Sequence, residues 1–179
     1  MGLVVRESAV AVVREGADSV RRLHLSMDDM EARDPHLAVV HRLWSSRRSA
    51  GRLPSRRSMD PLEMRPALGR IHIVETESED PLGYWYRLWG SLVSLDGGRN
   101  YTNTFVAECE PKVYRDAVAA DYATVVRTGE PSYQEVEAVL NFLTYQYARL
   151  ILPLAENGRT VTNLLVCVHE RPLAALGRS

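Results

Sequence analysis

The chain has 179 residues, of which 45% are hydrophobic and 25% are charged, and its formal net charge at pH 7 is -1. This balance is typical of one globular domain that can bury enough surface to fold without disulfides or a structural metal. It argues against a dedicated nucleic-acid binder, and every apolar run is shorter than the stretch of about 18 residues that a membrane helix needs.

Reactive residue types are few. Cys109 and Cys167 lie far apart and no Cys/His cluster has metal-ligand spacing, so we expect two free thiols in a reducing cytoplasm and no metal site. The first residues offer no basic stretch before a long apolar segment, so no signal peptide is expected. Lys112 is the single lysine, and its place at a predicted helix start favours a solvated side chain over Schiff-base or P-loop chemistry.

The N-terminal third is predicted to be helical. Residues 1–25 carry apolar side chains at roughly helical spacing, interrupted by Gly16, which predicts a helical arm. Ser26, followed by acidic residues, is typical of a helix N-terminus. Four residues then recur at three- and four-residue steps and form one apolar face: Leu37, Val40, His41 and Trp44.

After residue 70 the hydrophobic pattern alternates instead. Residues 70–76 and 83–90 are expected to form a hairpin, and residues 91–110, rich in Gly and small polar side chains, to form short helices and turns. A long helix is expected from Pro111 to Gly129. Three more strands should follow, over residues 132–140, 143–154 and 159–170, the last two joined by an Asn157-Gly158 turn.

Several short motifs accompany this order of elements. They are Trp44, Gly51 to Arg56 (GRLPSR), Asp60 to Pro66 (DPLEMRP), Tyr86 to Ser91 (YRLWGS), Gly98 to Thr102 (GRNYT) and Gly129 to Pro131 (GEP). Together, over roughly residues 35–170, they resemble a bacterial family of stand-alone PAS domains.

The resemblance implies an α+β fold in which a five-stranded antiparallel sheet and helices on one face enclose a small pocket. We divide the chain into an N-terminal helical arm, 1–25, and a PAS-like domain, 26–179, with its core at about 35–170. The resemblance also implies a sensor or interaction module, and it provides no catalytic residue.

Strand alternation selects the side chains that would line such a pocket. The ligand-binding candidates are Tyr86 and Leu88 on one strand, Tyr101 and Phe105 on the helical side, and Tyr147 and Arg149, with Tyr145, on another strand. Arg149 would either anchor a ligand carboxylate or pair internally with Glu135 or Glu137.

No cofactor follows from these residues. Gly98 to Tyr101 resembles the flavin motif of light-oxygen-voltage domains, but Tyr101 stands where the reactive cysteine would be. Residues 112–128 contain no histidine that could bind haem. Leu95 to Asn100 departs from the Phe-Gly-Arg-Asp pattern of the family, so the pocket entrance is expected to differ.

Catalysis is not expected. No complete hydrolase, zinc-protease or dinucleotide motif occurs. Glu108 and Glu110 flank Cys109, and neighbouring carboxylates raise the pKa of a thiol, which disfavours its use as a nucleophile.

An arginine cluster points to a second kind of function. Between Asp34 and Asp60 no acidic residue occurs, while arginines accumulate. Arg52 and Arg56 have the Arg-x-x-x-Arg spacing by which PilZ domains bind cyclic dinucleotides, although the accompanying Asp/Asn-x-Ser-x-x-Gly signature is missing. We expect contacts with a partner or a phosphate group to be made by Arg47, Arg48, Arg52 and Arg56.

Two functions therefore stay open. One is a sensory or signalling module that binds a small molecule or protein partner, with its N-terminal helix available for homodimer packing. The other is an adaptor without a ligand, which docks a protein, a cyclic dinucleotide or nucleic acid through its N-terminal helices and arginine cluster.

Overall fold

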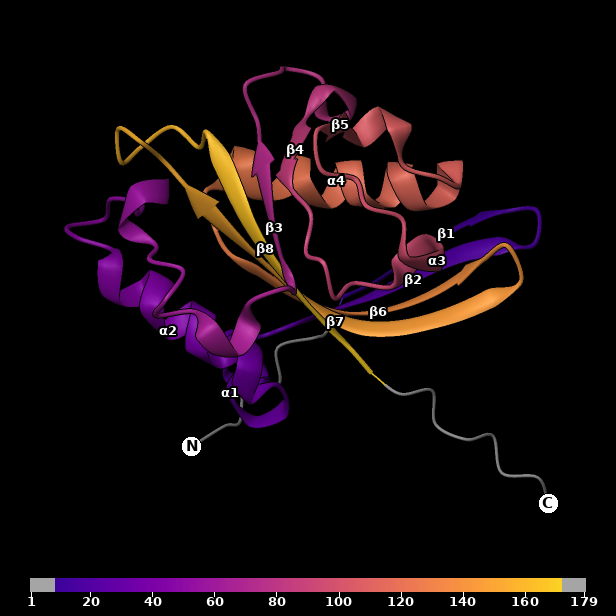
Figure 1. Ribbon diagram of the computed structural model, residues 1–179, viewed down its shortest axis with the longest axis horizontal. Coiled ribbons are helices and arrows are strands. Elements are labelled where there is room, and N and C mark those ends of the chain that lie inside the picture. The colour runs from indigo at the N-terminus through magenta and orange to yellow at the C-terminus, as the bar shows by residue number, and fades with distance from the viewer. Residues whose placement is uncertain (1–8, 172–179) are drawn as a thin grey trace.

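An eight-stranded antiparallel sheet forms the centre of the protein in a computed structural model that describes residues 9–171 (Figure 1). Its strands are β1 (Val10–Glu15), β2 (Asp18–Leu25), β3 (Ile71–Glu75), β4 (Trp85–Leu88), β5 (Thr104–Phe105), β6 (Ser132–Leu140), β7 (Leu143–Leu154) and β8 (Asn163–Glu170). The spatial order is β1-β2-β6-β7-β8-β3-β4-β5, and each neighbouring pair is antiparallel.

Five of these strands are the ones expected from the sequence, and they lie together as β6-β7-β8-β3-β4. The bounds of β6 and β7 agree with the prediction, whereas β8 begins at Asn163 instead of residue 159. The expected count of five is wrong, because the hairpin β1–β2 extends the sheet beyond β6 and the short β5 extends it beyond β4.

The predicted N-terminal helical arm is also wrong within its described part. Residues 10–15 and 18–25 form a hairpin around Gly16, whose φ of 59° suits a tight turn. Val20 and Arg22 are buried while Arg21 between them is exposed, which is the alternation of a strand. In so short a valine-rich segment, the same apolar residues fit both a helical and an alternating pattern, so the pattern alone does not distinguish a helix from a strand. The β-branched valine side chains favour the strand. Residues 1–8 lie outside the described part.

Helices cover both faces of the sheet, which corrects the expectation of one covered face (Figure 1). The helices are α1 (Met27–Arg33), α2 (Pro35–Arg47), α3 (Leu95–Gly98) and α4 (Lys112–Thr128), with single 3-10 turns at η1 (Arg56–Ser58), η2 (Arg65–Ala67), η3 (Pro81–Gly83) and η4 (Val106–Glu108). One core packs under α4 and α3, and a second packs under α1, α2 and the segment that follows them.

The predicted helix start at Ser26 and the predicted helix stop at Gly129 are confirmed, whereas the break at Asp34 that divides α1 from α2 was not predicted. Ser26 and Asp29 form a capping box, in which the Ser26 hydroxyl accepts from the Asp29 amide at 3.1 Å and the Asp29 carboxylate accepts from the Ser26 amide at 3.2 Å. Pro35 begins α2, and α4 ends at Gly129 in the left-handed conformation. Of the residues 9–171, no helix is both long and apolar enough to cross a bilayer.

Replacing Ser26 by alanine is expected to lower the free energy of unfolding by about 1 kcal/mol, because the amide of Asp29 loses its acceptor. Urea denaturation measures the change. Ser46→Ala is the matched control: the Ser46 hydroxyl bonds only the Leu43 carbonyl within α2, and alanine favours the helix. Equal losses in the two variants would contradict this role of Ser26.

Candidate functional site

The predicted pocket beneath α4 is filled by its own aromatic side chains, which we call the aromatic interior. Tyr86, Tyr101 and Tyr147 are all buried there. The Tyr86 hydroxyl lies 3.2 Å from the Tyr122 hydroxyl, and the ring of Trp89 lies edge-on to that of Tyr101 with centroids 5.0 Å apart. Burial raises the pKa of Tyr86 and of Tyr122, so both phenols stay protonated. These side chains pack as a core.

Leu88 does not face this interior, although Tyr86 two residues earlier does. The pairing of β3 with β4 is irregular between Ile73 and Val74, so that Tyr86 lies opposite Val74 while Leu88 lies opposite Ile73. A bulge of this kind moves a side chain to the other face of the sheet. Leu88 is accordingly 47% exposed and lies on the face that α2 covers.

Phe105 is the second predicted pocket residue that lies elsewhere. It is 45% exposed and packs edge-on against Trp85, its cross-strand neighbour, with ring centroids 4.6 Å apart. The structure therefore brings Tyr86, Tyr101 and Tyr147 together with Arg149, and it separates Leu88 and Phe105 from them.

Arg149 belongs to a buried ionic cluster under α4. Its guanidinium donates to the Asp121 carboxylate and, at 2.6 Å, to the Gln134 side-chain oxygen. Arg22 on β2 donates to the other oxygen of Asp121 at 2.7 Å and to the Ala117 carbonyl at 3.0 Å. One carboxylate thus serves two buried guanidinium groups, which stabilises α4 against the sheet.

The predicted internal partners of Arg149, Glu135 and Glu137, are wrong. Gln134 is the cross-strand neighbour of Arg149, and successive residues of β6 point to opposite faces. Glu135 therefore lies on the face of the sheet away from α4, where it contacts α1 and the end of β8. The carboxylate that pairs with Arg149 comes from α4, and strand alternation alone could not identify it.

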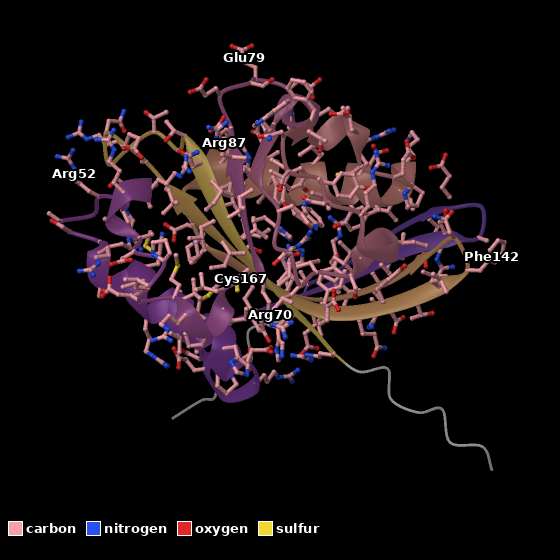
Figure 2. The ribbon with its side chains drawn as sticks, viewed as in Figure 1. Arg52, Arg70, Glu79, Arg87, Phe142 and Cys167 are labelled. Carbon is pink, nitrogen blue, oxygen red and sulfur yellow. The ribbon has the colours of Figure 1, made fainter. Side chains whose placement is uncertain are left out.

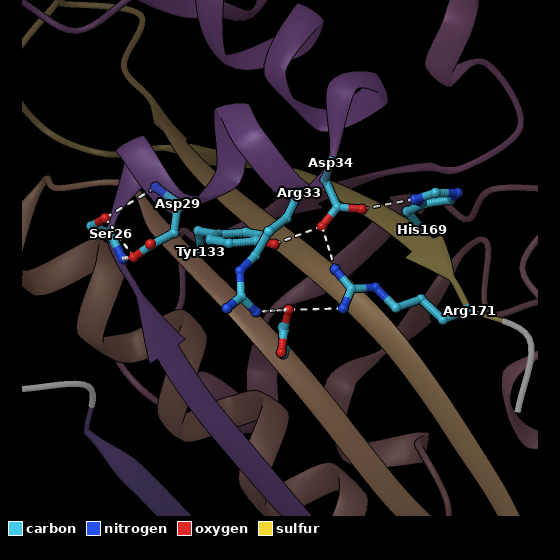
Figure 3. Close-up of polar contacts among 8 residues, drawn as sticks. Ser26, Asp29, Arg33, Asp34, Tyr133, His169 and Arg171 are labelled. Carbon is cyan, nitrogen blue, oxygen red and sulfur yellow. Dashed lines mark hydrogen bonds and ion pairs between the residues drawn. The ribbon is translucent and has the colours of Figure 1, made fainter. Parts of the chain in front are cut away.

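Asp34 organises a second polar cluster where α1 meets α2 (Figure 3). This carboxylate is 1% exposed and accepts from the Tyr133 hydroxyl at 2.6 Å, from His169 Nδ1 at 2.9 Å and from the Arg171 guanidinium at 2.6 Å. Arg171 also donates to Glu135 at 2.8 Å. The cluster ties the α1–α2 junction to β6 and to the end of β8.

His72 is a buried histidine that packs beside the aromatic interior. Its Nδ1 accepts from the Gly90 amide at 3.0 Å, and its ring stacks on Trp89 with centroids 3.8 Å apart. Burial lowers the pKa of His72 to about 3, so the ring is neutral. Among the described residues, no group of three or more His, Cys, Asp and Glu side chains could hold a metal. Cys167 lies near the middle of the molecule (Figure 2). Burial raises the pKa of its thiol to about 12, so it is not activated.

An open groove lies on the opposite face of the sheet, and we call it the β3 groove. Its volume is about 1190 Å³. The floor consists of sheet side chains, Ile71, Ile73, Leu154 and Leu165, and one wall consists of Met59, Met64 and Leu68 from the segment after α2. Leu88 stands at its mouth. The charged side chains that line it are Arg56, Arg57, Asp60, Glu75, Glu77 and Glu156.

The four arginines of the predicted contact set have different neighbours. Arg47 donates to Glu63, Arg48 lies over the ring of Trp44, and Arg52 donates to the Asn157 carbonyl. Figure 2 shows Arg52 at the outer edge of the molecule. Of the four, only Arg56 lines the β3 groove, where Arg57 joins it. Arg57 is not one of the four predicted contact residues, although it belongs to the same accumulation of arginines and directly follows Arg56.

Comparison with known families gives one match. A family model described as PAS domain matches residues 33–168, which include β3 to β7, α2 to α4 and most of β8. The match covers most of the chain and agrees with the resemblance found in its motifs. No curated protein and no solved structure matches.

Proposed function

Because the chain belongs to the PAS domain family, a family of sensory and signalling modules, we propose that it recognises a small molecule or protein partner through the β3 groove. The observation that supports this most directly is the contrast between the two faces. Tyr86, Tyr101 and Tyr147 pack in the aromatic interior, whereas the β3 groove is open and has an apolar floor and charged side chains in its lining. Recognition sites are typically of that kind.

We further propose that the module acts without catalysis and in the cytoplasm. The tyrosine phenols beneath α4 stay protonated, Cys167 is not activated, and His72 is held neutral. Homodimer packing through an N-terminal helix is not part of the proposal, because residues 10–25 form strands of the sheet.

Small fragments added to isotope-labelled protein test this proposal by NMR. We expect the largest amide shift changes at Ile73, Leu165 and Leu88, and small ones at Tyr86 and Tyr122. Leu88→Glu is expected to remove most of the binding, because it places a charge at the groove mouth without disturbing a buried side chain.

Leu62→Glu is the matched control for Leu88→Glu. Leu62 is 71% exposed and lies outside the groove lining, so this variant should bind fragments as the natural chain does. Fragments that shift the amides of the aromatic interior, with no effect of Leu88→Glu, would contradict recognition through the groove.

A further inference from the structure

The β3 groove has the shape and polarity of a site for a chain-like apolar group. Its floor residues on β3, Ile71 and Ile73, are buried, while Leu68 in its wall and Leu88 at its mouth are 44% and 47% exposed. A ligand that lies over the floor and against these two leucines would therefore cover apolar surface of both. Burial of such surface is the main favourable contribution to the binding of an alkyl chain.

A partner strand cannot enter this groove by pairing with the backbone of β3. Residues 73–75 of β3 are already hydrogen-bonded to β4 on one side and to β8 on the other. Addition of a strand needs a free sheet edge. Side chains must therefore provide the recognition, which fits a small amphipathic molecule.

The charged side chains of the groove differ in whether they already form hydrogen bonds or ion pairs. Asp60 accepts from the Leu62 amide at 2.9 Å, and Glu156 accepts from the Arg56 amide at 3.1 Å. Glu75 lies 3.9 Å from the Arg87 guanidinium. These three carboxylates each have a donor or a countercharge nearby.

The guanidinium groups of Arg56 and Arg57 have neither. Within residues 9–171 these two guanidinium groups form no ion pair and no hydrogen bond. Among the described carboxylates of the lining, Glu77 alone also forms neither. Each guanidinium carries five N–H donors in a fork that matches a carboxylate or phosphate. Arg56 and Arg57 thus offer two neighbouring guanidinium groups whose N–H donors are free to bind an anionic ligand.

We infer that the β3 groove binds a single-chain amphiphile with an acidic head group, its alkyl chain on Ile73 and Leu165 and its head at Arg56 and Arg57. This inference rests on the proposed function, because it names the ligand class of the same groove. The head group is a carboxylate, as in a free fatty acid, or a phosphate monoester, as in a phosphorylated long-chain alcohol.

Calorimetric titration with four ten-carbon probes below their micelle concentrations tests the class: decanoate, decyl phosphate, decyltrimethylammonium and decyl maltoside. The two acids are expected to bind at least about tenfold more tightly than the cationic and neutral probes. Tighter binding of decanoate would indicate a carboxylate head group in the natural ligand, and tighter binding of decyl phosphate would indicate a phosphate. Lengthening the chain from hexanoate to decanoate should strengthen binding about fourfold per methylene.

Variants separate the head group from the chain. Arg56→Ala with Arg57→Ala should weaken decanoate at least about tenfold and leave decyl maltoside unchanged. Arg127→Ala, an exposed arginine at the end of α4, is the control and should change neither. Leu88→Glu should weaken decanoate, decyl phosphate and decyl maltoside.

Two results would overturn the inference: tighter binding of the cationic probe, or equal binding of all four head groups together with no effect of the double arginine variant. In both cases the NMR experiment with small fragments still tests, independently of the ligand class, whether the groove is a binding site. Fragments that bind the groove while the acids show no preference refute the ligand class alone, and fragments that bind only beneath α4 refute the proposed function.

Discussion

Replacing Asp121 by asparagine is expected to lower the free energy of unfolding by about 3–5 kcal/mol, the largest effect of any single change considered for this protein. Asp121 is the one carboxylate that Arg22 and Arg149 share, and all three side chains are buried. Asparagine keeps the shape and removes the charge, so two guanidinium groups remain in a low-dielectric core without a countercharge. Urea denaturation monitored by circular dichroism measures the loss.

Asp116→Asn provides the matched control, because it makes the same chemical change on the same helix. Asp116 pairs with Lys112 at the surface, where an ion pair contributes less than about 1 kcal/mol. If both variants lost the same small amount of stability, the buried cluster would not be what holds α4 to the sheet.

Asp34→Asn is expected to cost about 2–3 kcal/mol. The carboxylate accepts three hydrogen bonds, and an asparagine amide can accept on one atom only. Arg171 keeps a second partner in Glu135, which moderates the loss. Because the cluster joins the α1–α2 junction to β8, hydrogen exchange should accelerate in both segments of the variant.

The contribution of Asp34 also has a defined pH dependence. Burial by itself raises the pKa of this carboxyl, but the hydrogen bonds from Tyr133, His169 and Arg171 outweigh burial and lower it below 3.8. A lowered pKa in the folded state gives stability that is fully present above the unfolded value and is lost as the pH falls through the folded value. The stability difference between the natural chain and Asp34→Asn should therefore shrink below about pH 4.

Asp28→Asn is the control for this titration, since Asp28 is an exposed carboxylate in the first turn of α1. Its variant should lose less stability at pH 7 than Asp34→Asn does. A difference between the natural chain and Asp34→Asn that stayed constant down to pH 2 would contradict the assignment of the effect to this carboxylate.

Much of the fold follows from local patterns in the sequence. Alternation located β6 and β7, and a capping signal at Ser26 and a glycine stop at Gly129 located helix ends. Each of these signals depends on the residue itself and its immediate neighbours, so it can be recognised without knowing the tertiary contacts.

The failures share a different cause. The β1–β2 hairpin is stabilised by its pairing with β6, more than 100 residues away, and that partner cannot be read from residues 10–25. Leu88 was assigned to the wrong face because strict alternation does not foresee a bulge. The groove itself is formed by segments distant in the sequence, so only its arginines had a local signal.

The most direct test of recognition through the β3 groove is a crystal structure of the protein grown with decanoate. We predict electron density for one alkyl chain along Ile73 and Leu165, with the carboxylate within hydrogen-bonding distance of Arg56 or Arg57. Density among Tyr86, Tyr122 and Tyr147 beneath α4, with the groove empty, would contradict it.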